Sequence, residues 1–121
     1  MKDYQMGAVE SRFADIIWQN EPILSAKLAK RSEELLGWKK STTYTVLKRL
    51  CDKGIFVNNG GTVTSLVSRE EFYSVQSERF VEETFDGSLP AFLAAFTARK
   101  NLTPDEIAEL RRMIDEYEEE E

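Results

Sequence analysis

Apolar residues in the first half of the chain recur at steps of three and four, the spacing that lines one face of a helix. The pattern predicts three helices, over residues 7–20, 25–36 and 41–53. Ser25 is the expected N-cap of the second helix. Gly37 and Gly54 are expected to end the second and third helices, because glycine readily adopts the left-handed conformation that closes a helix.

A β-hairpin is expected directly after these helices. Residues 55–57 and 62–67 are rich in β-branched residues, and between them the pair Asn59-Gly60 favours the positive φ angles of a tight turn. Three helices followed by a hairpin is the element order of a winged helix. The hairpin carries no Lys or Arg between Phe56 and Ser68, so contact between this wing and DNA phosphates stays open.

The second half of the chain predicts three further helices. Capping boxes at residues 68–71 and 103–106 open the first and the last of them, and Ser88 is expected to cap a short helix between them. We therefore expect a mainly α fold with a small β-hairpin. It consists of a winged helix-turn-helix DNA-binding domain over residues 1–68 and a helical dimerisation domain over residues 69–121.

The third expected helix has two different faces. Apolar and small side chains share one arc, whereas hydroxyl groups and cations share the other, where they suit base edges and phosphates. The predicted DNA-contacting residues are Lys40, Ser41, Thr42, Tyr44, Thr45, Lys48 and Arg49. Tyr44 borders the apolar arc, so partial burial and a contact to a base or sugar both remain open for it.

The overall charge of −6 is unusual for a protein that binds nucleic acid, but the charge is unevenly distributed. Residues 1–59 hold ten Lys and Arg against seven Asp and Glu, whereas residues 60–121 hold six against fifteen. The segment from Lys39 to Lys53 alone carries five cations against Asp52. This local excess suits contact with phosphates.

The composition excludes several kinds of chemistry. The chain has no histidine and a single cysteine, so a Ser-His-Asp or Cys-His catalytic site and a thiolate zinc or copper site are ruled out. We expect no enzyme, no catalytic residue, no metal and no cofactor, and we interpret Cys51 as a small core residue. There is neither a membrane-spanning apolar run nor a signal peptide, so no membrane insertion and a cytoplasmic location are expected.

The segment from Trp38 to Gly54 contains Thr-x-x-Thr-x-x-x-Arg-Leu-x-x-Lys-Gly. It resembles the recognition helix of the penicillinase-repressor family (BlaI, MecI, CopY). Three further segments are similar to that family: Glu10 with Ile17-Trp18, residues 67–72, and residues 102–107 with Leu110-Arg111. The ordered series covers most of the chain and is more specific than any one of its pieces.

This resemblance implies a homodimer on a palindromic operator of double-stranded DNA, repressing antibiotic-resistance, metal-homeostasis or stress genes. It also places Ser41, Thr42, Tyr44, Thr45, Lys48 and Arg49 at the family's DNA-facing positions. The cysteine cluster of the copper-responsive branch is absent here. In the β-lactam branch a membrane sensor protease cuts an Asn-Phe bond, and the bond that matches it in this chain is Ala95-Phe96.

The apolar positions of the second half suggest how the chain dimerises. The last helix has an apolar stripe that an isolated helix does not keep in water, and aromatic residues precede it. The predicted dimerisation residues are Phe92, Phe96, Ile107, Leu110, Ile114 and Tyr117. A ligand pocket is the alternative interpretation of the aromatic residues, and a winged-helix module that binds protein without direct DNA contact is the alternative function.

Overall fold

The computed structural model describes residues 5–120, with side chains as far as Glu118. The chain forms two compact units, one ending at Arg79 and the other beginning at Phe80. The expected boundary after Ser68, between a DNA-binding and a dimerisation domain, stays a prediction.

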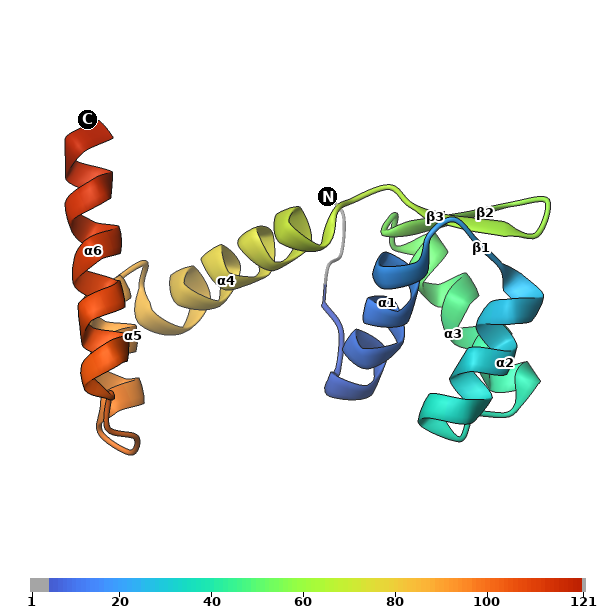
Figure 1. The fold of residues 1–121 in the computed structure, drawn as a ribbon, viewed down its shortest axis with the longest axis horizontal. Coiled ribbons are helices and arrows are strands. Elements are labelled where there is room, and N and C mark those ends of the chain that lie inside the picture. The colour runs from blue at the N-terminus through green and yellow to red at the C-terminus, as the bar shows by residue number, and fades with distance from the viewer. Residues whose placement is uncertain (1–4, 121) are drawn as a thin grey trace. The chain divides into compact units, whose positions relative to one another are not determined.

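The first unit contains three helices and a small sheet (Figure 1). Its elements are α1 (Ala8–Asn20), β1 (Ile23–Leu24), α2 (Ser25–Leu36), α3 (Lys40–Asp52), β2 (Phe56–Asn59) and β3 (Thr62–Ser65), followed by the start of α4 (Arg69–Phe85). The three strands are antiparallel in the order β1-β3-β2. The helices and hairpin expected from the sequence are present, and the mainly α winged-helix fold is confirmed.

Strand β1 is the element that the sequence pattern did not predict. It has only two residues and pairs with β3, with Ile23 opposite Val63. Because the chain enters α2 directly from this strand, Leu24 occupies the N-cap position and no side chain caps the helix. The expectation that Ser25 is the N-cap is therefore wrong. Its backbone N–H instead donates to the Gly61 carbonyl at 2.7 Å.

The hairpin turn is made by two glycines. Gly60 and Gly61 have φ angles of 59° and 97°, and the Asn58 side-chain oxygen accepts a hydrogen bond from the Gly61 N–H at 2.9 Å. Two consecutive positive φ angles are typical of the tightest hairpin turns, and glycine adopts them without steric cost. Asn59, expected within the turn, is the last residue of β2.

One hydrophobic core holds the first unit together. Its largest fully buried side chains include Phe13 from α1, Leu28 from α2, Leu50 from α3 and Phe56 from β2. Phe72 from α4 is also fully buried there. The first turns of α4 therefore belong to the same packed body as the helices and the wing.

Polar contacts fix the start of α4 on α1. The Ser68 hydroxyl accepts a hydrogen bond from the Glu71 N–H at 3.1 Å, which is the cap expected at the start of α4. The Trp18 indole N–H donates to the Val67 carbonyl at 3.0 Å, and Arg69 pairs with Asp15 at 3.0 Å. These contacts order the chain where the wing leads into α4.

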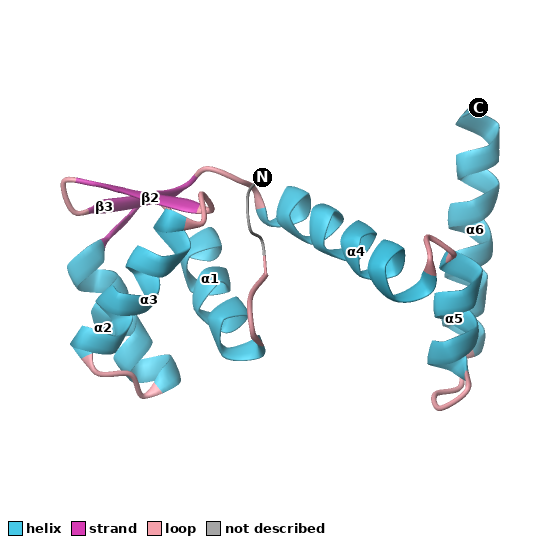
Figure 2. Ribbon diagram, turned by 180° about the vertical axis from the view of Figure 1, so that it is seen from behind, coloured by secondary structure: helices cyan, strands magenta, loops and turns pink. Residues whose placement is uncertain are grey.

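The second unit comprises the end of α4 together with α5 (Leu89–Thr97) and α6 (Pro104–Glu120), and Figure 2 shows its helical content. The Ser88 hydroxyl caps α5 by accepting from the Ala91 N–H at 3.1 Å. At α6 the Thr103 and Glu106 side chains each accept from the other's backbone N–H, a complete capping box. Hydrogen bonds from Thr103 lower the pKa of Glu106.

Candidate nucleic-acid interface

Helix α3 buries one side and exposes the other. Thr43, Val46, Leu47 and Leu50 are buried. The opposite side, here called the polar face of α3, is exposed to solvent. It consists of Ser41, Thr42, Thr45, Lys48 and Arg49, and Lys40 is exposed at the first turn beside it. The structure thus brings together six of the seven residues predicted to contact DNA, while Tyr44 lies at the edge of this face.

The two cations of the polar face have different surroundings. Lys48 pairs with Asp52 one turn later, at 3.3 Å, and both side chains remain well exposed. Such an exposed pair contributes little to stability and leaves the ammonium group accessible. Arg49 contacts Glu10 of α1, with 3.6 Å between Nη1 and Oε2. A guanidinium group has five N–H donors, so this pair still leaves donors for another partner.

Tyr44 is half-buried at the edge of α3. Its hydroxyl donates a hydrogen bond to the Ser25 hydroxyl at 3.3 Å, and its ring lies 6.0 Å from the Lys40 ammonium group. The phenol thus links α3 to the first residue of α2. The link orients Lys40 and Tyr44 together at the beginning of the polar face.

The wing turn is connected to the same region. Ser25 contacts Tyr44 through its side chain and Gly61 through its backbone N–H. Asn58, Asn59 and Gly60 are exposed at the tip of the hairpin. The polar groups at the tip are amides and backbone N–H groups, which suit phosphate oxygens without adding charge.

The predicted dimerisation residues lie in the second unit, where the exposure pattern is unusual. Among the side chains that the structure describes from residue 80 to 118, none is buried. Phe96, Ile114 and Tyr117 are 44%, 60% and 67% exposed, and Ile107 is also exposed. Phe92 and Leu110 are half-buried and line, with Phe96, a mainly apolar groove of about 310 Å³ between α5 and α6.

The Ala95-Phe96 bond lies inside α5, which ends at Thr97. Both of its residues are exposed. The Phe96 carbonyl accepts the Lys100 N–H at 3.2 Å, so the helix continues its hydrogen bonding past this bond. A protease would have to unwind this end of the helix before cutting there.

Sequence reasoning missed two contributors to this interface. Glu10 holds Arg49 from α1, and Ser25 links Tyr44 to the wing, yet each lies far from its partner in sequence. The local pattern contains no signal for either contact. Among the residues that the structure describes, there is no cluster of three or more Cys, Asp or Glu side chains that could hold a metal ion. No helix in this part of the chain is long and apolar enough to cross a membrane.

Known proteins are similar to this chain over most of its length. A family described as penicillinase repressor matches residues 6–116. The methicillin resistance regulatory protein MecI of Staphylococcus aureus strain Mu50 is 25% identical over 117 residues, which cover 93% of this chain and 95% of that protein. The penicillinase repressor of Bacillus licheniformis is also 25% identical over 117 residues, covering 93% and 91% of the two chains.

Proposed function

The chain belongs to the penicillinase-repressor family, and on this premise we propose that it represses transcription by binding a palindromic DNA operator as a homodimer. The relatives named above are a regulatory protein and a repressor, which supports regulation rather than catalysis. By analogy with their names, the regulated genes are antibiotic-resistance or stress genes. We place the protein in the cytoplasm, where it would meet its DNA operator.

The observation that carries this proposal is the polar face of α3. Short hydroxyl groups at Ser41, Thr42 and Thr45 stand beside exposed cations at Lys48 and Arg49. The opposite side of the helix is anchored in the core, so the helix can enter a major groove without unfolding. In this arrangement the cations contact phosphates or guanine edges, and the hydroxyl groups contact bases or phosphates.

The second unit supports a dimer. Its described side chains include none that is buried, yet Phe96, Ile114 and Tyr117 present large apolar surfaces to water. Large apolar side chains exposed in this number suit a protein interface. A second copy of the chain is the occupant we propose, because two winged helices supply the affinity that a single small DNA interface seldom reaches.

DNA binding is tested by fluorescence anisotropy with a labelled duplex from the region upstream of the chain's own gene. We expect this duplex to bind about 10³-fold or more tightly than a shuffled duplex of equal composition. Affinity should also fall as salt rises, with a slope of about 0.9 per phosphate contacted. Equal affinity for both duplexes would reject the repressor and favour a protein-interaction module.

The dimeric mechanism is tested by operator spacing. A two-fold protein requires its two half-sites on the same side of the duplex, separated by about 10 base pairs or a multiple. Inserting about 5 base pairs between the half-sites should abolish tight binding, and inserting about 10 should largely restore it. Footprints of equal strength at all three spacings would contradict a dimer that holds both half-sites at once.

A membrane sensor protease is the partner we propose for inactivation. A cut at Ala95-Phe96 would separate α6 from the DNA-binding unit and so remove part of the dimer surface. Immunoblots of induced cells should then show a fragment that ends at Ala95. Release of the promoter with the chain still intact would instead show that the signal acts without proteolysis.

A further inference from the structure

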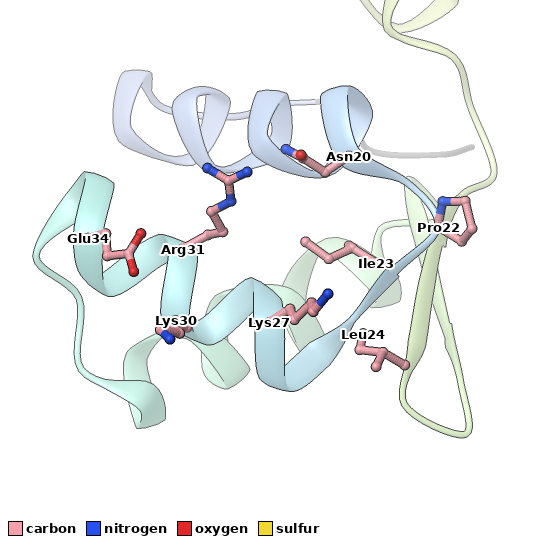
Figure 3. Close-up of a pocket in the computed structure, with 8 residues that line it drawn as sticks. All are labelled: Asn20, Pro22, Ile23, Leu24, Lys27, Lys30, Arg31 and Glu34. Carbon is pink, nitrogen blue, oxygen red and sulfur yellow. The ribbon is translucent and has the colours of Figure 1, made fainter.

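A pocket of about 430 Å³ lies in the first unit between the end of α1, β1 and α2 (Figure 3). This volume is in the range of small-molecule sites, which is about 300–1,000 Å³. One side of the pocket is apolar and the other carries cations. Its lining residues are Asn20, Pro22, Ile23, Leu24, Lys27, Lys30, Arg31 and Glu34.

The cations of the pocket are concentrated on one side of α2. Lys27, Lys30 and Arg31 outnumber Glu34, the one acid among the lining residues. Their spacing of three and four residues places them on neighbouring turns of the same helix face. In a protein with a net charge of −6, this is a local positive region that attracts anions.

These cations have no partner among the described residues: no ion pair or hydrogen bond involves the side chains of Lys27, Lys30 or Arg31. Some cations of the first unit are neutralised locally, as Lys48 and Arg69 are, since each pairs with a carboxylate. The pocket thus holds positive charge that the protein itself does not neutralise.

The directions of the side chains indicate the kind of ligand. Figure 3 shows Arg31 extending from α2 toward α1, while Lys27 extends toward β1. Beside them Ile23 is almost fully buried and Leu24 is half exposed, which gives the pocket an apolar wall. Arginine binds carboxylates and phosphates through paired hydrogen bonds. An anionic group attached to an apolar ring or chain fits both halves of the pocket.

The pocket adjoins the link between α3 and the wing. Leu24 is followed directly by Ser25, which accepts the Tyr44 hydroxyl at 3.3 Å and donates its N–H to Gly61 at 2.7 Å. A ligand in the pocket therefore touches the segment that orients the start of α3 relative to the wing turn. It also brings negative charge to the DNA-binding unit.

We propose that this pocket binds a small organic anion and that the bound anion lowers affinity for operator DNA. The effect on DNA rests on the proposed function, whereas binding of the anion does not. The class of ligand is a carboxylate or phosphate that carries an apolar group.

The binding site is tested with the isotopically labelled full-length protein and three probes: phenyl phosphate, inorganic phosphate and phenol. Phenyl phosphate should shift the backbone amide signals of residues 20–34 at lower concentration than either of the other probes. The double variant Lys27→Gln/Arg31→Gln should weaken phenyl phosphate binding by about tenfold or more, since it removes two charged hydrogen-bond donors. The control Arg99→Gln/Lys100→Gln makes the same change of charge in the second unit and should bind as the parent does.

The effect on DNA is tested by anisotropy with operator duplex at saturating phenyl phosphate. We expect operator affinity to fall about fivefold or more for the parent protein, the size typical of coupled sites, and clearly less for the double variant, because the variant binds phenyl phosphate more weakly. Absence of shifts at residues 20–34, or equal binding by the double variant, would overturn the site. Shifts without any change in operator affinity would overturn its regulatory role. If the free protein does not bind its operator, the proposed repressor fails, while the amide shifts still decide the site.

Discussion

Replacing Ile114 by alanine should weaken the dimer without disturbing the DNA-binding unit. Ile114 lies on α6 in the second unit, whereas the buried core ends with Phe72 in the first. The side chain is 60% exposed in the single chain, so burial against a second copy removes that fraction from water. Alanine keeps the helix and removes only the carbon atoms beyond Cβ.

The expected magnitude follows from the area that the second copy covers. A buried methylene contributes about 0.8 kcal/mol, and Ile→Ala removes about three such groups. With 60% of the side chain newly buried, each copy loses about 1.5 kcal/mol. A symmetric dimer contains the site twice and loses about 3 kcal/mol, which corresponds to an increase in Kd of about 100-fold.

Sedimentation equilibrium over a range of protein concentrations measures this change directly. Asp115→Ala is the matched control, because it truncates the next residue, an exposed polar side chain about 100° around α6 from Ile114 and outside the apolar stripe, and should leave Kd nearly unchanged. Circular dichroism should show the same helical content for all three proteins. An Ile114→Ala protein with the parent's Kd would refute the placement of Ile114 in the interface.

Three other outcomes are expected. In anisotropy titrations, Lys48→Ala should weaken operator binding by about 1–3 kcal/mol if the ammonium group contacts a base. If it contacts a phosphate, the slope of log affinity against log salt concentration should fall by about one unit. Lys100→Ala should change neither quantity. Ser32→Ala should raise the free energy of unfolding by about 1 kcal/mol in urea titrations. The reason is that the Ser32 hydroxyl is buried without a hydrogen-bond partner among the described residues, and a loss of stability would contradict it. Burial and then the charge of Asp52 raise the pKa of the Cys51 thiol, so less thiolate is present at a given pH. Iodoacetamide should therefore react with Cys51 more slowly than with free cysteine. Asp52→Asn should speed the reaction, and an unchanged rate would argue against the charge effect.

Much of the fold could be predicted because its signals are local. The caps at Ser68, Ser88 and Thr103 form hydrogen bonds within a few residues of themselves, so a short segment contains both partners. The same applies to Gly37, whose positive φ ends α2. The polar face of α3 was also predictable, because helical periodicity alone separates its buried and exposed sides.

The rest depended on partners that are distant in sequence. Strand β1 has two residues and no alternating pattern, and it exists because the free edge of β3 lies beside it. For the same reason Ser25 begins α2 instead of capping it. Its contact with Tyr44 joins residues nineteen positions apart, which no local pattern reports.

The sequence by itself determined which segments are helical, where they start and stop, and which side of α3 is polar, since these properties depend on neighbours within about one or two helical turns. Only the tertiary structure decided how that side is held and what surrounds it. It brings Glu10 to Arg49 and gathers the cations of α2 beside β1, because both arrangements follow from packing the helices and the sheet on one core.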